Sequence, residues 1–376
     1  MDTTVSLARC PNYTPEALSG ALDAALTPLG GLDWVQPGMK IAIKANLLSA
    51  KRPDTAATTH PALLLALCEK LTARGASVVV GDSPGGPYAA AYVNTVYSVA
   101  GVTAVHASGA TLNEDFSEQD VAFPNGAVLK QFRCTAYLLQ ADAIINVSKL
   151  KTHGMMAYTG AVKNFFGAIP GFLKFEYHHL YPQHSTFANM LVDICEFFKP
   201  TLSITDAVVG MEGNGPSNGT PRQLGFIAAA RNPHALDMVC SRIIGLAPSD
   251  VPTLLAAQQR ELLPKTTGAL SLSGNIEDFA VADFKSSPQI SIVTFANKLG
   301  SSVVRGLFAS RPAAQDAACT GCAVCAKLCP AKAIDMQNER PKIHRSACIR
   351  CFCCQEFCPT GAMQSRRPLP ARLFHK

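Results

Sequence analysis

Two cysteine-rich stretches near the C-terminus repeat each other: CTGCAVCAKLCP at residues 319–330 and CIRCFCCQEFCP at residues 348–359. Both read C-x-x-C-x-x-C-x-x-x-C-P, and the second copy begins 29 residues after the first. Three cysteines at three-residue steps let a short loop bind one face of an iron–sulfur cube, while the fourth, followed by proline, reaches a neighbouring cube. The spacing therefore predicts two 4Fe–4S clusters.

The doubled pattern also predicts which cysteines share a cluster. One cluster is expected on Cys319, Cys322, Cys325 and Cys358, and the other on Cys329, Cys348, Cys351 and Cys354. A zinc site would need one closed set of four ligands, and a disulfide scaffold would need a secreted protein, so neither is favoured. Cys353 lies between two predicted ligands. We interpret it as a buried filler thiol, with an alternative ligand or a redox-active thiol as the other interpretation.

The remaining cysteines and the charge separate the tail from the rest of the chain. Five cysteines lack ligand spacing and are expected to be core thiols: Cys10, Cys68, Cys134, Cys195 and Cys240. Residues 319–376 hold ten Lys or Arg against three Asp or Glu, whereas the rest holds 23 against 24. Part of this positive charge compensates the anionic clusters. The remainder is either a solvated basic face or a docking surface for an acidic electron carrier or an anionic substrate.

Composition limits the class of protein. Of 376 residues, 48% are hydrophobic and 16% are charged, which excludes a disordered chain and supplies a core for about two domains. We expect no membrane span, because no apolar run approaches the required length, and no signal peptide, so the expected location is the cytoplasm. Aromatic stacking positions are lacking in the basic tail, so nucleic acid is not expected as a partner. The sequence does not set the oligomeric state.

Before the tail, apolar runs of strand length alternate with helical patterns. The predicted strands are 39–45, 76–80, 102–106, 141–147, 202–206, 224–229, 280–285 and 289–294, and the predicted helices are 62–73, 88–100, 254–263 and 296–308. This alternation predicts an α/β fold with a largely parallel sheet and flanking helices, followed by a small α+β two-cluster module. The predicted boundaries are an α/β domain over 1–309, a linker over 310–317, the module over 318–366 and a basic tail over 367–376.

Lysines, histidine and asparagine gather after the strand predicted at 141–147. We expect them in a loop at the carboxyl end of that strand, where open α/β sheets bind ligands. The catalytic candidates are Lys149, Lys151, His153, Lys163, Asn164 and Glu212. The lysines would bind an anionic group, His153 would supply a proton, and Asn164 would orient the ligand.

Other strand ends are expected to converge on the same crevice. The predicted cofactor-binding residues are Lys44, Asn46, His60, Asp82, Ser83, Gly85 and Gly86. The glycine-rich loop would offer backbone N–H groups to an anion, although a structural turn with a helix cap is an equal interpretation. It matches neither the P-loop pattern nor G-x-G-x-x-G, so no nucleotide is expected, and neither a flavin nor nickel is assigned.

Several separated segments carry a family resemblance. KANLLSAKRPDTAATTHPALLLALCEKL, GASVVVGDSPGG, INVSKLKTHGMMAYTGAVKNFFGAIPG and TDAVVGMEGNGPSNGTP resemble the domain of unknown function 362 family, over roughly residues 38–245. The tail resembles bacterial two-cluster ferredoxins over about 45 residues. The resemblance implies an iron–sulfur, ferredoxin-like protein. The order His153, Thr159-Gly160, Lys163 and Pro170-Gly171 is also similar to the N-terminal domain of nickel-pincer lactate racemases, which implies a crevice for a small anion.

Three functions fit these observations. The first is an iron–sulfur oxidoreductase that takes electrons from an external protein and passes them to a small anionic substrate or cofactor in the α/β domain. The second is a ferredoxin-type adaptor that relays electrons between partner proteins. The third is a racemase or isomerase with structural or sensory clusters. Exposed clusters lose iron on oxidation, so we expect an oxygen-labile protein that requires anaerobic handling.

Overall fold

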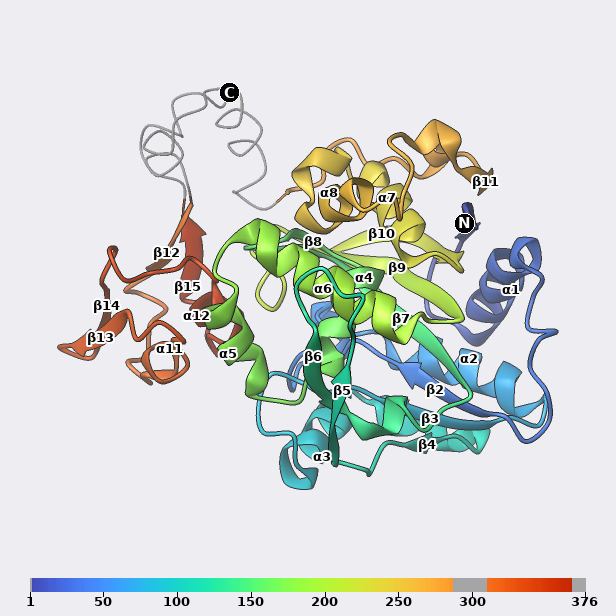
Figure 1. Ribbon diagram of the computed structural model, residues 1–376, viewed down its shortest axis with the longest axis horizontal. Helices are drawn as coiled ribbons and strands as arrows, with labels where there is room; N and C mark the ends of the chain where they lie inside the picture. Colours follow the sequence, from blue (N-terminus) through green and yellow to red (C-terminus); the bar gives the residue numbers. More distant parts are fainter. Residues whose placement is uncertain (1, 287–309, 367–376) are drawn as a thin grey trace.

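The predicted strands pair into one central sheet (Figure 1). In the computed structural model, which describes residues 2–286 and 310–366, the strand order is β4 (Thr111–Leu112), β3 (Ser77–Gly81), β2 (Lys40–Lys44), β7 (Ala143–His153), β9 (Leu202–Glu212), β10 (Thr220–Ala230), β1 (Thr4–Arg9) and β11 (Ser271–Ser273). Neighbours from β4 to β9 are parallel, and β10 is antiparallel to both of its neighbours. The largely parallel α/β class is confirmed.

Successive side chains of a strand point to opposite faces of the sheet, and in the central strands both faces are buried. In β2, Ile41 and Ile43 pack in one hydrophobic cluster, whereas Ala42 between them packs in another on the opposite face. Parallel strands covered on both faces need such apolar residues at every position, which is why KIAIK and SVVVG read as continuous runs. The register pairs Ile41 with Val78 on one side and with Ala143 on the other.

Helices form a layer on each side of the sheet (Figure 1). One face packs against α1 (Pro15–Leu26), α2 (Pro61–Thr72) and α3 (Ala90–Val99), and the other against α4 (Ala161–Asn164), α6 (His184–Phe198), α7 (Pro233–Ile243) and α8 (Pro252–Gln259). An outer hairpin of β5 (Glu118–Ala122) and β6 (Gln131–Thr135) packs on α6, and α5 (Leu173–Leu180) precedes α6. The five cysteines without ligand spacing are all buried, as expected.

Two predicted strands differ from the structure. Residues 102–106 lie in a 3-10 helix, Val102–Ser108, because Gly101 and Gly109 stand at its two ends with φ of 69° and 82° and turn the chain. Residues 280–285 form no strand. The predicted strand at 289–294 and the predicted helix at 296–308 lie outside the described residues.

Strand β7 is longer than predicted, and this corrects the expected loop. Residues 149–153 continue the strand, paired with β9 on one side and with β8 (Ala157–Thr159) on the other. All eleven residues of β7 are buried, including two lysines and a histidine. We predicted a loop here because the residues are charged. A buried strand can nevertheless contain charged side chains wherever these have ion-pair or hydrogen-bond partners.

The cysteine module contains two antiparallel strand pairs and two short helices. β12 (Arg311–Ala314) pairs with β15 (Met363–Arg366), β13 (Ile334–Gln337) pairs with β14 (Arg340–Ile343), and the helices are α11 (Val324–Lys327) and α12 (Cys353–Glu356). Residues 311–314 were expected to be linker but belong to the module, because they pair with its last strand. The basic tail predicted at 367–376 lies outside the described residues.

Helix α12 attaches the module to the larger domain, beside α5 (Figure 1). The side-chain amide of Gln355 donates to Asn214 Oδ1 at 2.6 Å, and Asn218 Nδ2 donates to the Gln355 carbonyl at 3.1 Å. The rings of Phe357 and Phe175 lie 5.1 Å apart. The loop between β9 and β10 therefore holds one side of α12 by hydrogen bonds, while α5 holds the other by apolar contact.

Asn214→Ala should loosen this attachment. The substitution removes the nearest acceptor of the Gln355 amide and leaves it the more distant Asn214 and Gly215 carbonyls, at a cost of about 1 kcal/mol. We expect faster amide hydrogen exchange in residues 351–358, with no change in the central sheet. Asn189→Ala is the control, since Asn189 donates only within α6, to Ser185. Unchanged exchange in α12 would contradict the assigned role of the loop.

Candidate functional site

A cavity of about 50 Å³ lies between the carboxyl edge of the sheet and the cysteine module. Chain order reverses between β2 and β7, and open α/β sheets bind ligands at this switch point, beyond the carboxyl ends of the strands. The sheet edge and α4 contribute Asn46, Asp82, Ser83, Gly85, Lys151, Thr159, Lys163 and Asn164. Helix α5 contributes Lys174, Phe175 and His178, and the module contributes Cys353, Glu356 and Phe357.

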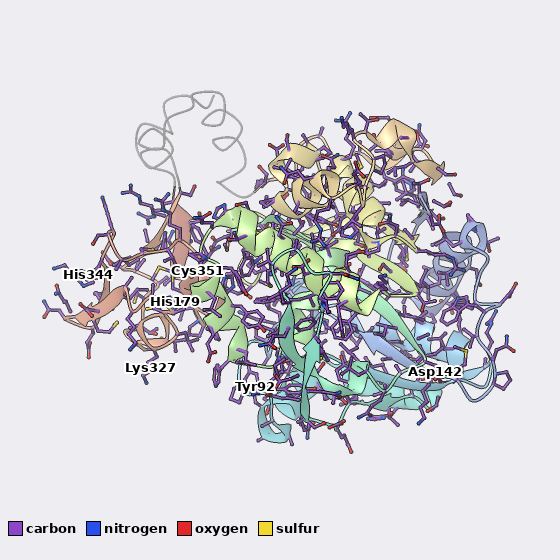
Figure 2. All side chains as sticks on the ribbon, viewed as in Figure 1. Tyr92, Asp142, His179, Lys327, His344 and Cys351 are labelled. Carbon is purple, nitrogen blue, oxygen red and sulfur yellow. The ribbon has the colours of Figure 1, made fainter. Side chains whose placement is uncertain are left out.

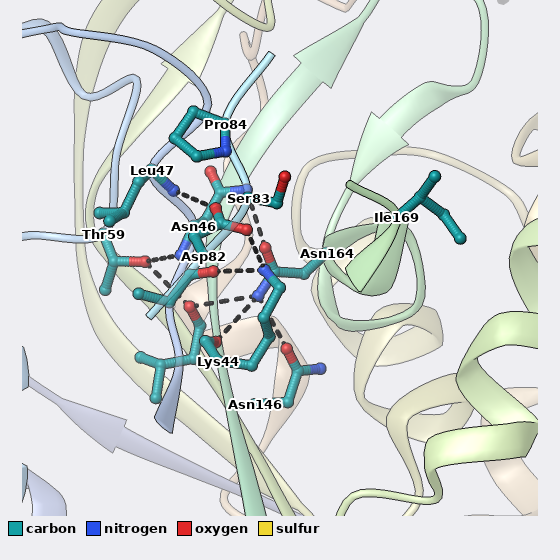
Figure 3. A network of polar contacts seen from close by, with 12 residues as sticks. Lys44, Asn46, Leu47, Thr59, Asp82, Ser83, Pro84, Asn146, Asn164 and Ile169 are labelled. Atoms are coloured by element: carbon teal, nitrogen blue, oxygen red, sulfur yellow. Dashed lines mark hydrogen bonds and ion pairs between the residues drawn. The ribbon is translucent and has the colours of Figure 1, made fainter. Parts of the chain in front are cut away.

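A buried ion pair joins the ends of β2 and β3 (Figure 3). Lys44 Nζ lies 2.6 Å from Asp82 Oδ1, and both side chains are shielded from solvent. The other carboxylate oxygen accepts from the Leu47 N–H at 2.7 Å. A Cβ on Gly167 would lie 2.1 Å from Asp82 Oδ1, so only glycine fits there. The pair holds Asp82 at the cavity wall while cancelling its charge.

Amide side chains form the floor beside this pair (Figure 3). Asn46 donates to Asn164 Oδ1 at 2.9 Å, and Asn164 donates to Asn146 Oδ1 at 2.8 Å. The ammonium of Lys151 donates to Asn46 Oδ1 and to the Ala57 carbonyl, both at 2.6 Å. Lys151 is therefore held in place by neutral oxygens and has no carboxylate partner within the described residues.

Burial without a close carboxylate shifts the lysines toward their neutral forms. Burial, and next the charge of Lys163, lowers the pKa of Lys151 to about 7. Burial lowers the pKa of Lys174 to about 7 as well, and its ammonium donates to Ser83 Oγ at 3.1 Å. Lys163 also has a pKa lowered by burial, and it makes no hydrogen bond to any part of the chain that the structure describes. Its ammonium lies 5.7 Å from the centre of the Phe166 ring.

His178 completes the wall from α5. Its ring stacks on Phe187, with centroids 4.3 Å apart, and burial followed by the charge of Lys163 lowers its pKa to about 3. His178 Nδ1 and Thr159 Oγ1 are both buried without a hydrogen-bond partner in the described residues. At neutral pH this side of the cavity therefore presents an uncharged imidazole and an unsatisfied hydroxyl.

The structure brings together about half of the predicted site residues. The cavity is lined by Asn46, Asp82, Ser83, Gly85, Lys151, Lys163 and Asn164, with Lys44 directly behind Asp82. His153 does not line it. Its Nδ1 accepts from the Met155 N–H at 2.9 Å, its Nε2 lies 3.8 Å from a Glu356 carboxylate oxygen, and burial keeps its pKa well below the usual value.

The other predicted residues lie elsewhere. Lys149 pairs with Asp206 at 2.9 Å in a separate buried network, where Tyr13 stacks on the His60 ring with centroids 3.6 Å apart. His60 instead caps α2, where its Nδ1 accepts from the Ala62 N–H at 3.2 Å. Glu212 accepts from the Lys285 N–H at 3.1 Å, away from the cavity. Gly86 packs against Tyr92.

Sequence reasoning missed the contributions of α5 and α12. Lys174 and His178 are four residues apart, which places them on one face of a helix and was a readable signal. Cys353, Glu356 and Phe357 had no such signal, because their place in the wall depends on how the module docks against the larger domain.

The four cysteines predicted to bind the first cluster lie around one cavity. A second cavity, of about 20 Å³, is lined by Cys319, Cys322, Cys325 and Cys358. The crossing ligand of each half is held in the same way, because Met363 N–H donates to Cys358 Sγ at 3.4 Å and Ala333 N–H donates to Cys329 Sγ at 3.2 Å. Such N–H groups favour the thiolate form that a cluster requires.

The second ligand set gathers nearer to the larger domain. Burial, followed by the charges of Cys351, Cys348, Cys329 and Cys325, raises the pKa of the Cys354 thiol. Cys351 and Cys354 are buried, whereas Cys322 of the first set is exposed. In Figure 2, Cys351 lies on the side of the module that faces the larger domain, and Lys327 and His344 lie further out. Cys353 is 1% exposed and lines the main cavity.

The α/β domain and the cysteine module each match a known protein family. Residues 41–242 match the model of a domain of unknown function, DUF362, and residues 311–359 match a 4Fe–4S dicluster domain. A thylakoid-associated protein of Synechocystis sp. is 33% identical over 279 residues, covering 72% of this chain and 83% of its own. The chain belongs to the DUF362 family, and its dicluster domain binds two 4Fe–4S clusters.

Two solved structures have a similar outline. The lactate racemase apoprotein of Thermoanaerobacterium thermosaccharolyticum has a TM-score of 0.40 and 10% identity, covering 65% of this chain and 57% of its own. A protein from Thermotoga maritima has a TM-score of 0.39 and 15% identity, covering 62% and 60%. This chain thus spans less than two thirds of either one. Within the described residues, no helix is both long and apolar enough to cross a membrane.

Asp82→Asn should destabilise the protein strongly. The substitution keeps an oxygen for the Leu47 N–H but leaves the buried Lys44 ammonium without its counter-charge, which typically costs about 3–5 kcal/mol. Chemical denaturation should show this loss. Asp283→Asn, which breaks a solvent-exposed pair with Arg222, should cost only about 0–1 kcal/mol. Equal effects of the two substitutions would show that the Lys44 pair is not structurally important.

Cys353→Ala should retain both clusters. Cys353 belongs to neither ligand set, so anaerobically purified Cys353→Ala protein should hold about eight irons per chain, as the wild type should. Cys351→Ala removes a ligand from the same helical region and should lose iron. Iron analysis with electron paramagnetic resonance measures both. Loss of iron from Cys353→Ala would make Cys353 a ligand.

Proposed function

We propose that this member of the DUF362 family is an iron–sulfur oxidoreductase, which delivers electrons through its C-terminal module to a small anionic substrate or cofactor in the main cavity. One observation carries the proposal. The cavity has lysines of the α/β domain on one side and residues of the second cluster-binding segment on the other, among them Cys353 and Glu356. A binding site for an anion and an electron-transfer module therefore share one wall.

The lysines supply the means of binding. Lys151, Lys163 and Lys174 all line the cavity, and buried ammonium groups attract an anion far more strongly than exposed ones do. Phe175 and Phe357 line the same cavity and add apolar surface beside the ammonium groups. An anion held here would be fixed against the wall that the module provides.

The cysteine sets would hold the redox groups. When bound, the two clusters supply single electrons at low potential. Because Cys351 and Cys354 are buried toward the larger domain and Cys322 is exposed, electrons would enter from the side of the first set. The basic residues of the module, such as the exposed Lys327 of α11, suit an acidic electron-carrier protein as the external partner.

Protons would come from lysine, and His153 is no longer the candidate. His153 lies behind the wall, and burial keeps it neutral. Lys151 and Lys174 have pKa values lowered to about 7, so each can hold or release a proton at neutral pH next to the bound anion. A group with a pKa near the working pH is best suited to transfer protons.

The cavity favours an enzyme over a relay adaptor. An adaptor needs exposed docking surfaces, and nothing in that role requires three buried lysines around one cavity. A racemase or isomerase with structural clusters would not need its cavity walled by the cluster-binding segment. The cytoplasmic location stays a prediction.

Lys163→Met tests the proposal. Wild-type protein with both clusters, photoreduced anaerobically with a deazaflavin, should be reoxidised by at least one of thiosulfate, fumarate and oxaloacetate, which are reducible dianions at neutral pH. Loss of one charge-assisted contact costs about 1.5–3 kcal/mol, so Lys163→Met should react roughly 10- to 100-fold more slowly at low anion concentration.

The cluster signals in electron paramagnetic resonance should be unchanged in this variant. Lys40→Met is the control, because Lys40 is exposed at the opposite end of β2. If Lys163→Met is reoxidised as fast as wild type by every anion, or if wild type reacts with none, the protein is better explained as an adaptor.

A further inference from the structure

We propose that the main cavity is a site for a doubly charged oxyanion, and that this anion binds together with protons. The inference specifies the ligand of the proposed function and rests on it, because it concerns the same cavity. It is carried by the charges, hydrogen bonds and size of the lining.

The charges of the lining do not balance. Three lysines face the cavity, Lys151, Lys163 and Lys174, against two carboxylates, Asp82 and Glu356. Asp82 is already neutralised by Lys44 at 2.6 Å behind the wall. Among the lining side chains, Glu356 alone remains to balance three ammonium groups, so the fully protonated lining carries two positive charges that no lining carboxylate offsets.

Other buried lysines of this sheet edge do have counter-charges. Lys44 pairs with Asp82, and Lys149 pairs with Asp206 at 2.9 Å. By contrast, Lys151 donates only to neutral oxygens, and Lys163 has no hydrogen-bond partner in the described part of the chain. Because an uncompensated buried charge is costly, lysines of this kind indicate that a ligand supplies the missing charge.

Uncharged groups in the wall point to the same ligand. Thr159 and His178 both line the cavity, and Thr159 Oγ1 and His178 Nδ1 are buried and lack hydrogen-bond partners among the described residues. Both can donate a hydrogen bond to an oxygen, His178 in the appropriate tautomer. Ammonium and hydroxyl donors around one small space fit the oxygens of an oxyanion.

The size of the cavity further limits the class of ligand. A cavity of about 50 Å³ has room for a few water molecules or for a tetrahedral or planar oxyanion. Nucleotides and flavins need the several hundred Å³ that are typical of cofactor sites. The chemical class is therefore a compact dianion, either a single-centre oxyanion or a small dicarboxylate.

Proton uptake follows from the state of two lysines. Lys151 and Lys174 have pKa values lowered to about 7. The charged groups that act on Lys151 are Lys163, Glu356, Lys149 and Asp82, and those that act on Lys174 are Asp82, Lys44, Glu356 and Lys163. A dianion among them raises both pKa values, since it stabilises the protonated forms.

This rise in the two lysine pKa values determines how the affinity for the anion changes with pH. Below pH 7 both lysines are protonated with or without the anion, so affinity is greatest and binding takes up few protons. Above pH 7 the free lysines lose protons that the complex retains, so binding takes them up and affinity falls. The fall is about tenfold per pH unit for each proton taken up.

Sulfate is a suitable probe, because its charge is constant across this range and it is not reduced by low-potential clusters. Calorimetry of the full chain with both clusters, in two buffers of different ionisation enthalpy, should show little proton uptake at pH 6 and one to two protons at pH 8. Perchlorate has the same shape with one charge and should bind at least tenfold more weakly at equal ionic strength. Equal affinities, or sulfate affinity that does not fall above pH 7, would overturn the inference.

Lysine substitutions test which side chains take up the protons. Lys174→Met should take up about one proton less at pH 8 and bind sulfate at least tenfold more weakly, whereas Lys40→Met should match wild type. Lys151→Met provides the same test if Lys174→Met does not fold. Wild-type proton uptake in both lysine variants would contradict the assignment.

The two proposals fail separately. Sulfate binding with proton uptake, combined with no reoxidation by any anion, would refute the oxidoreductase and leave the dianion site. Reoxidation that depends on Lys163, combined with equal binding of sulfate and perchlorate, would refute only the dianion.

Discussion

A buried ammonium group needs a counter-charge, and the carboxyl edge of this sheet is built around that constraint. Lys44 and Lys149 meet it within the chain, through Asp82 and Asp206. These pairs connect strand ends that are far apart in sequence, so they fix the shape of the edge as well as its charge. Lys151, held on neutral oxygens, does not meet the constraint internally. The same edge therefore divides into a structural part and a part that remains electrostatically incomplete.

Much of the architecture could be predicted from the sequence, because each part has a local signal. The cysteine spacing predicted both ligand sets, and the set around Cys358 lines one cavity. Continuous apolar runs predicted β2 and β3, since a strand covered on both faces has apolar residues at every position. The apolar periodicity over 62–73 predicted α2, which spans Pro61–Thr72. The strand at 102–106 failed because two flanking glycines, and not the β-branched residues between them, set the local backbone.

The site could be predicted only in part, because residue type does not show which partner a side chain will find. Lys149 and Lys151 are two residues apart in one strand, yet Lys149 lies opposite Asp206 in the register and is neutralised, whereas Lys151 lies opposite Met211. Similarly, His153 was expected to transfer protons, but its Nδ1 is used to order the turn after β7. Both outcomes depend on strand register and burial, which are tertiary properties.

Docking of the module links the two halves of the site more tightly than a tethered ferredoxin would be linked. Helix α12 carries Cys354 of one ligand set, is followed directly by Cys358 of the other, and places Cys353 and Glu356 in the cavity wall. A Cβ on Gly85 would lie 2.1 Å from the Phe357 ring, so the glycine-rich loop fits the module only because it lacks side chains there. The sequence left that loop open as either an anion-binding turn or a structural turn. Its closest requirement for glycine is instead the contact with the module, which means that a shift of the module would alter the cavity wall and the ligand segment together.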